Sequence, residues 1–320
     1  MPHVLGYYPQ WVSDNVLPPE RVDYRLFTHL CHAFAVPAED GSIPATTEKA
    51  GAALCANGRQ AGGVRVLLSL GGADTGKRLA AVASDPAKRA RLLDGLAGQV
   101  ARCGYAGVDV DWEFPESAAE RDLLSGFVRD LRARLGKDAL IGMAVPAGDW
   151  YGRWFDSAAL LPHVDLLNVM TYDLHGPWSA RAGHNAPLSY LADALSYWTK
   201  QKNCPREKVL LGIPCYGRGF AVRRWGDAQD KQKKPAHPYV GLRDVEALRA
   251  AGWKQERDRE AGVPYLAAPD GSELISYEDE ASAKAKGRWA REEKAGGVFF
   301  WEISQDFEGG THRIVKAARG

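Results

Sequence analysis

The stretch that decides the fold is Tyr105-Ala106-Gly107-Val108-Asp109-Val110-Asp111-Trp112-Glu113. Side chains of a β-strand point alternately to its two faces, so the three acids of this stretch share one face and the apolar residues share the other. This division suits a strand of a parallel barrel, in which the outer face packs under helices and the inner face leads to a site at the C-terminal end. The stretch therefore predicts a barrel strand whose inner face carries carboxylates.

The three acids of this strand, Asp109, Asp111 and Glu113, are expected to follow one another at intervals of about 6.6 Å. At an effective dielectric constant near 20, each ionised pair would repel by roughly 2.5 kcal/mol. Three full negative charges are therefore unfavourable near neutral pH, and we expect the row to keep a proton. Glu113, the longest and most C-terminal of the three, is the predicted general acid. The alternative is that the acids only bind backbone amides or a cation at a strand end.

Eight short apolar segments are expected to be strands of one barrel. Most are rich in Val, Ile, Leu or aromatic residues, as strands buried on both faces should be. They are residues 4–8, 26–35, 64–70, 107–113, 140–145, 166–172, 209–213 and 298–301. Helical patterns lie between most of them, for example at 87–103, 117–135 and 188–202. This alternation predicts an α/β fold, namely a (β/α)8 TIM barrel.

One interval between expected elements is longer than the others. Residues 216–276 follow the seventh expected strand and are polar and rich in Pro and Gly. We expect them to form a small α+β insertion domain on the active-site rim, with residues 1–215 and 277–320 forming the catalytic barrel. Without these 61 residues, 259 of the 320 remain, close to the roughly 250 residues of a TIM barrel.

The composition excludes some classes of partner. The 320 residues are 45% hydrophobic, which is enough for a sizeable core, and 41 basic against 40 acidic residues leave a formal net charge of +1. This balance offers no electric field that would attract nucleic acid or an anionic membrane. We therefore expect a neutral partner, and we expect the protein to be a monomer.

The cysteines and the N-terminal residues bear on cofactors and location. The five cysteines are widely spread and form no CxxC pair, so they indicate neither zinc nor a redox dithiol, and we expect no metal and no cofactor. No apolar run is long enough to span a membrane, and the first expected strand begins at Val4 with no signal peptide before it. We expect a secreted protein whose signal peptide is absent from this chain, with a cytoplasmic protein as the alternative.

Polar and aromatic residues gather at the C-terminal ends of the expected strands, where a barrel enzyme holds its site. Besides the acid row they are Tyr7 on strand one, Phe34 on two, Met170, Tyr172 and Asp173 on six, Tyr216 and Arg218 on seven, and Trp301 on eight. Alternation predicts that Tyr172 points inward with Met170 below it, and that Asp173 lies at the rim. The alternative is that the aromatic residues and Met170 belong to the core, and that Arg218 is a structural ion-pair partner.

At these positions the sequence resembles the family 18 glycoside hydrolases, the chitinase family. The DGxDxDxE signature of that family matches Ala106 to Glu113 at every position but the first. Further similar segments are SxGG at 69–72, MxYD at 170–173, GIPxYGR at 212–218, the late Trp301 and the opening GYYPxW at 6–11. The resemblance runs from the first expected strand to the eighth, and the inserted segment resembles the α+β insertion of the subgroup with a larger cleft.

The resemblance implies a retaining hydrolase that cleaves β-1,4 bonds of N-acetylglucosamine polymers, either chitin or chitooligosaccharides. It implies that Glu113 protonates the glycosidic oxygen while the 2-acetamido carbonyl of the substrate attacks the anomeric carbon. It also implies that Asp111 orients the acetamido group, that Asp109 shares its proton, and that Tyr172 hydrogen-bonds the acetamido oxygen. Trp301 would form the floor under the sugar. The substrate-binding candidates are Tyr7, Phe34, Trp112, Met170, Asp173, Trp178, Tyr216, Arg218 and Trp301.

Two positions depart from the pattern of the family. Ala106 replaces the usual Asp at the start of the signature, which we expect to remove a structural hydrogen bond and not a catalyst. Ala73 follows SxGG, where many relatives carry a tryptophan for the leaving-group sugar. Binding on that side, and processive action on crystalline polymer, are therefore in question.

Three other functions compete with this interpretation. An endo-β-N-acetylglucosaminidase acting on N-glycans or peptidoglycan would use the same acids. A non-catalytic chitin-binding lectin on the same barrel would lack the acid, whereas Glu113 is present. A nucleotide enzyme is suggested by residues 71–77, which nearly spell a phosphate-binding loop, but position 78 is Arg and not the Ser or Thr that would bind the metal.

Overall fold

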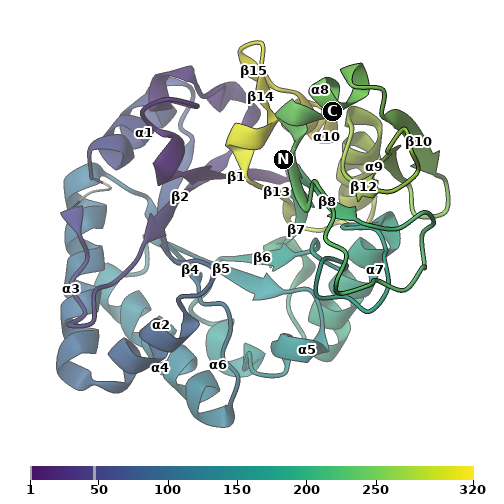
Figure 1. Cartoon of the computed structure of the whole chain (residues 1–320). Coiled ribbons are helices and arrows are strands. Elements are labelled where there is room, and N and C mark those ends of the chain that lie inside the picture. Colours follow the sequence, from purple (N-terminus) through teal and green to yellow (C-terminus); the bar gives the residue numbers. More distant parts are fainter. Residues whose placement is uncertain (1, 46–47) are drawn as a thin grey trace.

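Eight parallel strands form a closed barrel in the computed structural model, which describes residues 2–45 and 48–320 (Figure 1). The order around the barrel is β1-β13-β7-β6-β5-β4-β3-β2. The strands are β1 (His3–Pro9), β2 (His29–Ala35), β3 (Arg65–Gly71), β4 (Gly107–Asp111), β5 (Leu140–Pro146), β6 (Leu166–Met170), β7 (Val209–Pro214) and β13 (Gly297–Trp301). The predicted TIM barrel is confirmed, and each strand overlaps a predicted segment.

Two of the predicted strands end two residues earlier than expected, and the second strand begins three residues later. β4 ends at Asp111 and β6 ends at Met170, so Glu113 and Tyr172 lie just beyond the strands that position them. The second apolar segment begins with a 3-10 helix, Tyr24–Leu26, and the strand starts only at His29.

Helices cover the outside of the barrel and account for the regular alternation along the chain (Figure 1). They are α1 (Glu48–Gln60), α2 (Gly76–Ser84), α3 (Pro86–Cys103), α4 (Ala118–Leu135), α5 (Asp149–Gly152), α6 (Ser157–Leu160), α7 (Leu188–Ser196), α9 (Glu280–Glu292) and α10 (Arg313–Arg319). The predicted helix at 87–103 is α3, which Asp85 caps by accepting hydrogen bonds from the backbone N–H groups of Ala87 and Lys88. The predicted helix at 188–202 is α7, continued by a π-helical turn over Tyr197–Gln201.

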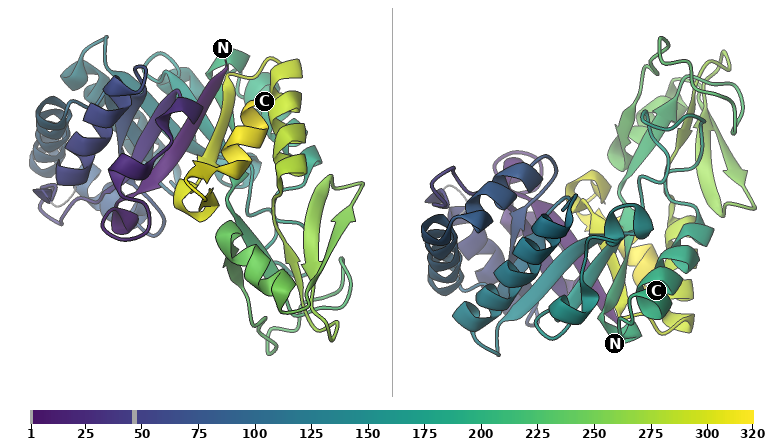
Figure 2. Two further views of the ribbon diagram at one scale, coloured as in Figure 1. Left: turned by 90° about the horizontal axis from the view of Figure 1, so that it is seen from above. Right: turned by 90° about the horizontal axis from the view of Figure 1, so that it is seen from below.

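A second, antiparallel sheet is built by part of the chain that follows β7. Its order is β10-β11-β12-β8-β9, and it carries the short helix α8 (Val245–Ala250). The strands are β8 (Tyr216–Phe220), β9 (Tyr239–Gly241), β10 (Lys254–Asp258), β11 (Val263–Ala267) and β12 (Leu274–Ser276). Figure 2 shows this sheet projecting from the barrel on the side opposite the N-terminus.

This sheet bears on the predicted domains. Its strands and α8 all lie within residues 216–276, the expected insertion, while the boundaries of the two domains stay a prediction. Tyr216 and Arg218, which we expected at the end of the seventh barrel strand, belong to β8 of this second sheet. A short hairpin of β14 (Phe307–Glu308) and β15 (Thr311–His312) follows the barrel.

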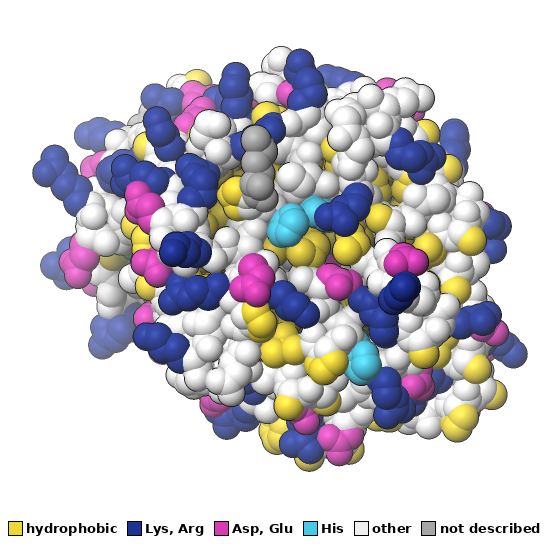
Figure 3. Space-filling view, turned by 180° about the vertical axis from the view of Figure 1, so that it is seen from behind, with side chains coloured by type: hydrophobic (Ala, Val, Ile, Leu, Met, Phe, Trp, Pro, Cys, Tyr) yellow, Lys and Arg dark blue, Asp and Glu magenta, His cyan; other side chains and the backbone are white. Residues whose placement is uncertain are grey.

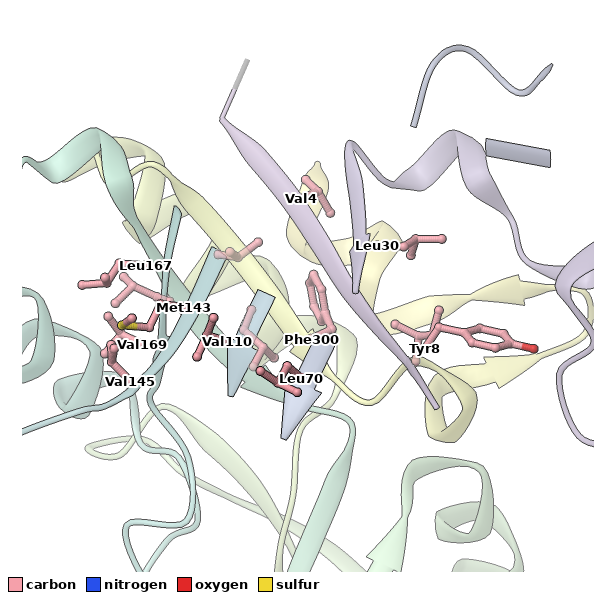
Figure 4. Packing of buried hydrophobic residues seen from close by; sticks show 14 of the residues in the cluster. Val4, Tyr8, Leu30, Leu70, Val110, Met143, Val145, Leu167, Val169 and Phe300 are labelled. Atoms are coloured by element: carbon pink, nitrogen blue, oxygen red, sulfur yellow. The ribbon is translucent and has the colours of Figure 1, made fainter. Parts of the chain in front are cut away.

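Alternation along β4 divides its side chains between the two sides of the barrel wall, as predicted. Val108 and Val110 are fully buried in the main apolar cluster under the helices, and burial of one such side chain stabilises the fold by about 1.5–3 kcal/mol. Figure 4 shows Val110 beside Leu70, its register partner on β3. Asp109, on the opposite face, is fully buried in hydrogen bonds inside the barrel.

The charged side chains of one face and the cysteines are distributed as follows. On the face turned away from the second sheet, Lys and Arg side chains are spread among Asp and Glu side chains (Figure 3). The five cysteines are buried and unpaired. Within residues 2–45 and 48–320, none of the helices combines the length and apolar character needed to cross a membrane.

Candidate active site

A cleft of about 1210 Å³ opens at the C-terminal ends of the barrel strands and brings most of the predicted site residues together. The predicted residues that line it are Tyr7, Phe34, Asp111, Glu113, Met170, Tyr172, Asp173, Trp178, Tyr216, Arg218 and Trp301. A second cavity, of about 1150 Å³, is lined in part by α9, α10 and the start of β1 and contains none of the predicted residues. We therefore place the candidate site in the first cleft.

Asp109 lies below the cleft and forms a buried hydrogen-bonded network. Its carboxylate accepts hydrogen bonds from the Tyr7 hydroxyl at 3.0 Å, the Ser69 hydroxyl at 2.7 Å and Asn168 Nδ2 at 3.1 Å. Asn168 Nδ2 also donates to the Tyr7 hydroxyl at 3.0 Å. Burial raises the pKa of Asp109 from 3.8 to about 6, and the hydrogen bonds from Ser69, Tyr7 and Asn168 limit this rise because they stabilise the charged form.

Asp111 and Glu113 lie next along the acid row and interact with each other. Burial is the largest cause that raises the pKa of Asp111 well above 3.8, followed by the negative charges of Glu113 and Asp109. Burial also raises the pKa of Glu113 from 4.5 to about 7, followed by the charges of Asp173 and Asp74. Because the charge of Glu113 raises the pKa of Asp111, the two carboxyls are not both ionised near neutral pH. The row therefore holds a proton near neutral pH, in the direction that the spacing predicted.

Tyr172 stands beside the acid row, in a space that a glycine keeps open. Its ring packs edge-on against Phe299 at 5.9 Å and against Tyr216 at 6.2 Å between ring centroids. A Cβ atom on Gly212 of β7 would lie only 2.7 Å from Cε1 of Tyr172. Burial raises the pKa of Tyr172 well above 10, so its hydroxyl keeps its proton and can donate a hydrogen bond.

Aromatic rings from β1, β2 and β13 form one side of the cleft. Trp301 lies at the end of β13, edge-on to Tyr7 at 5.5 Å and stacked on Phe34 at 5.6 Å between centroids. Trp11 continues this group, 6.3 Å from Phe34. The carbon face of a sugar packs well on such rings.

Another part of the cleft lining carries an ion pair surrounded by rings. Arg218 donates from Nε and from a terminal nitrogen to the two carboxylate oxygens of Asp173, at 2.8 Å each. The guanidinium lies over the rings of Trp178, Tyr216 and Tyr239, between 5.0 and 5.5 Å from their centroids. A paired, stacked arginine of this kind is held in one orientation, and Lys could not replace it.

Trp112 does not reach the cleft, which corrects its prediction as a substrate-binding residue. It is 2% exposed and packs in the main apolar cluster together with Val108 and Val110. The reason is the alternation that we used for the acids: residue 112 has the parity of the outward face. Within the described parts of the chain, no group of three or more His, Cys, Asp or Glu residues could hold a metal ion.

The structure adds residues that sequence reasoning missed. Asn168 has the same strand parity as Met170 and Tyr172, so alternation along β6 could have indicated it. Trp150 and Tyr151 lie in the α5 segment and line the cleft, and an aromatic pair just after a strand was the available signal. The large hydrophobic side chains that the structure leaves exposed all line this cleft, and they are Trp11, Trp150, Trp178 and Tyr239.

Comparison with known proteins gives relatives along nearly the whole chain. A probable endochitinase of Caenorhabditis elegans is 30% identical in an alignment 278 residues long, which covers 77% of this chain and 45% of that protein. Chitinase 1 of Aphanocladium album is 28% identical in an alignment 286 residues long, which covers 80% of this chain and 65% of that protein. The chain thus spans between about half and two thirds of the length of these two relatives.

The solved structures and the family profile complete the comparison. The structure of a family 18 chitinase from Cycas revoluta, in complex with allosamidin, superposes with a TM-score of 0.88 over 99% of this chain and 98% of that chain. At 24% identity this likeness shows the common fold. The profile of the family described as "Glycosyl hydrolases family 18" matches residues 3–306. Because this match covers nearly all of the chain, the protein belongs to glycosyl hydrolase family 18.

Proposed function

We propose that this protein hydrolyses β-1,4 bonds between N-acetylglucosamine residues, with retention of configuration and with the 2-acetamido group of the substrate as the nucleophile. The observation that carries the proposal is the acid row, which is buried at its base and ends in Glu113 inside an open aromatic cleft. The names of the relatives as chitinases support the same substrate class.

Glu113 is the group that would protonate the glycosidic oxygen. A general acid works best when its pKa lies near the working pH, and burial with neighbouring negative charges raises the pKa of Glu113 to about 7. As the proton moves to the glycosidic oxygen, the bond between that oxygen and the anomeric carbon breaks. Glu113, now ionised, is then placed to take a proton from the water that attacks in the second step.

The nucleophile would come from the substrate, because Asp109 and Asp111 follow one another along β4 on the same side of the site as Glu113. The acetamido oxygen attacks the anomeric carbon and forms a cyclic oxazolinium ion, which carries positive charge. Asp111, buried between Asp109 and Glu113, can orient the acetamido N–H and stabilise that charge. The Tyr172 hydroxyl can donate a hydrogen bond to the acetamido oxygen. Water then attacks the anomeric carbon from the face that the leaving group vacated, which gives overall retention.

The cleft suits an extended, uncharged chain of sugars. The exposed aromatic side chains Trp11, Trp150, Trp178 and Tyr239 all lie along it. Asp111, Glu113, Asp149 and Asp173 line it with Arg218, so carboxyls outnumber cations among these residues, which disfavours an anionic substrate. The Cycas revoluta chitinase, whose fold this chain shares, has also been solved in complex with (GlcNAc)3.

Two competing functions remain to be separated by experiment. A lectin on this barrel would have no use for a protonated Glu113 in the cleft, so the raised pKa of this residue favours an enzyme. An endo-β-N-acetylglucosaminidase that acts on N-glycans or peptidoglycan would use the same acids. The acidic lining favours neutral chitooligosaccharides over peptidoglycan, which carries carboxylates.

The test is to incubate the protein with N-acetylglucosamine oligomers, peptidoglycan and an N-glycoprotein side by side, and to identify products by mass spectrometry. We expect cleavage of the oligomers, with the β-anomer appearing first by NMR, and loss of cleavage in Glu113→Gln with oligomer binding retained. An initial α-anomer would contradict the retaining mechanism. Substantial turnover by Glu113→Gln would contradict the role of this residue.

A further inference from the structure

Asn185 lies outside the cleft lining, yet it is hydrogen-bonded to two segments that line the cleft and to the end of β12. It is 1% exposed and lies between β6 and α7. Its side-chain Oδ1 accepts a hydrogen bond from the backbone N–H of Asp173 at 2.8 Å, and its Nδ2 donates to the Tyr216 carbonyl at 3.3 Å. Its backbone N–H donates to the Ser276 hydroxyl at 3.1 Å, and its carbonyl accepts from the N–H of Leu174 at 3.0 Å.

The two side-chain bonds require a carboxamide. Asp173 offers an N–H donor on one side, and Tyr216 offers a carbonyl acceptor on the other. A carboxamide supplies one acceptor and one donor, and reversing its two ends would set donor against donor and oxygen against oxygen. A carboxylate at this position could not donate to Tyr216.

These bonds hold both partners of the ion pair that faces the acid row. Asp173 has φ +57°, a left-handed conformation that residues other than glycine seldom adopt, and the bonds from Asp173 and Leu174 to Asn185 fix the chain there. Tyr216 lies two residues before Arg218 on β8, and Arg218 binds both carboxylate oxygens of Asp173. Asn185 therefore ties the backbone of Asp173 itself and, at Tyr216, the strand that carries Arg218.

A second set of bonds anchors Asn185 from the side of the antiparallel sheet. The neighbouring His184 contacts the Ser276 hydroxyl through Nδ1 and the Asp258 carboxylate through Nε2, each at 3.1 Å. Ser276 accepts the N–H of Asn185, so its own hydrogen is free to be donated to His184. Asp258 ends β10 and Ser276 ends β12. The antiparallel sheet therefore anchors His184 and Asn185, and Asn185 in turn is bonded to Asp173.

We propose that Asn185 is a positioning residue, whose buried carboxamide holds the Asp173–Arg218 ion pair in its place beside the acid row. The inference rests on the proposed function only in taking Glu113 as the acid. The groups that face Glu113 are Asp111 from β4, Asp74 after β3, Asp173 and Tyr172 after β6, and Arg218 through Asp173. Asp173 contributes the largest charge effect on the pKa of Glu113, so a displaced Asp173 lowers that pKa.

The test follows the Glu113 carboxyl directly, by 13C NMR of protein labelled at the glutamate carboxyl carbons, with Glu113→Gln assigning the signal. We expect Asn185→Ala to lower the pKa of Glu113 by at least about half a unit, and the alkaline limb of kcat/KM to move with it. In the background of Asp173→Asn, Asn185→Ala should produce no further fall. Ser282→Ala is the matched control. This buried hydroxyl donates a hydrogen bond to Glu278 at 2.6 Å, and within the described residues its hydrogen bonds go to Glu278 and Asp279 and not to Asp173, so the variant should leave the titration unchanged.

The possible outcomes of these measurements distinguish a positioning role of Asn185 from a purely structural one. A folded Asn185→Ala variant whose Glu113 titrates as in the parent protein, or at a higher pH, overturns the proposal. If this variant does not fold, Asn185→Ser is measured on the same terms, and failure of both to fold while Ser282→Ala folds gives Asn185 a purely structural role and also overturns it. If the parent protein hydrolyses none of the sugars, the proposed function fails, whereas the NMR titration still decides the role of Asn185.

Discussion

Replacing Gly212 with Ala tests whether the space for Tyr172 is as closed as the structure shows. The added Cβ would lie 2.7 Å from Cε1 of Tyr172 and 2.8 Å from Cζ of Phe299. Carbon atoms are in favourable contact at about 3.5–4.0 Å, so one ring must move by about 1 Å. Gly212 lies inside β7, and both neighbours are rings, so the contact cannot be relieved by turning a flexible chain end.

The expected cost appears in both stability and turnover. Overpacking of this kind destabilises a core by about 1–3 kcal/mol, and each kcal/mol lowers Tm by roughly 1–2 °C in a protein of 320 residues. A displacement of about 1 Å at a catalytic group costs roughly 100-fold in rate, so kcat on N-acetylglucosamine oligomers should fall by that order.

Gly95→Ala is the matched control for this substitution. Gly95 lies in α3, where the new Cβ would meet Ile43 at an ordinary 3.5 Å. Because Ala favours helix over Gly, this variant should be as stable as the parent protein or more stable by about 0.5–1 kcal/mol, with full activity. Differential scanning fluorimetry and steady-state kinetics measure both effects. A Gly212→Ala protein with the parent Tm and the parent kcat would refute the packing argument.

Three further predictions concern single groups. Tyr172→Phe should lower kcat by roughly 10²-fold while KM changes less than about three-fold, because the hydroxyl hydrogen-bonds the acetamido oxygen most strongly as charge develops on the acetamido group in the transition state. A change in KM as large as the change in kcat would count against this role. The pKa of Glu113 is raised from 4.5 to about 7, so the parent protein loses stability as pH rises through this window, and the Tm of Glu113→Gln relative to the parent should increase from pH 4 to pH 8; a constant difference would contradict the shift. Lys286→Met should cost about 3–5 kcal/mol in urea unfolding, because it leaves the fully buried Glu278 without its ion-pair partner, and a cost below 1 kcal/mol would show that the pair is dispensable.

Strand periodicity explains why the barrel could be predicted before its structure was known. The alternation of side chains is a local property of an extended chain, so the parity of residue 109 assigned Asp109, Asp111 and Glu113 to one face and Trp112 to the other. Applied without exception, the same rule would have excluded Trp112 from the cleft. It would also have included Asn168, which the structure bonds to Asp109 and Tyr7.

Contacts between residues of different segments had no comparable signal in the sequence. Asn185 and Tyr216 are 31 residues apart and belong to segments without a common period, and only the folded chain brings them to 3.3 Å. Arg218 was expected near the cleft, but its strand belongs to the second sheet, because the chain leaves the barrel after β7. Trp150 lies in a short helix after β5, where no alternation applies.

The sequence by itself determined the barrel, the acid row and the face on which that row lies, because these follow from the spacing of residues along single strands. The tertiary structure alone decided the surroundings of the acid row, on which the pKa values and the positions of its neighbours depend. The burial that raises the pKa of Glu113, the pairing of Asp173 with Arg218 and the space that Gly212 leaves for Tyr172 each depend on distances between strands and loops. Such distances are set by barrel closure and side-chain packing, and no local pattern in the chain encodes them.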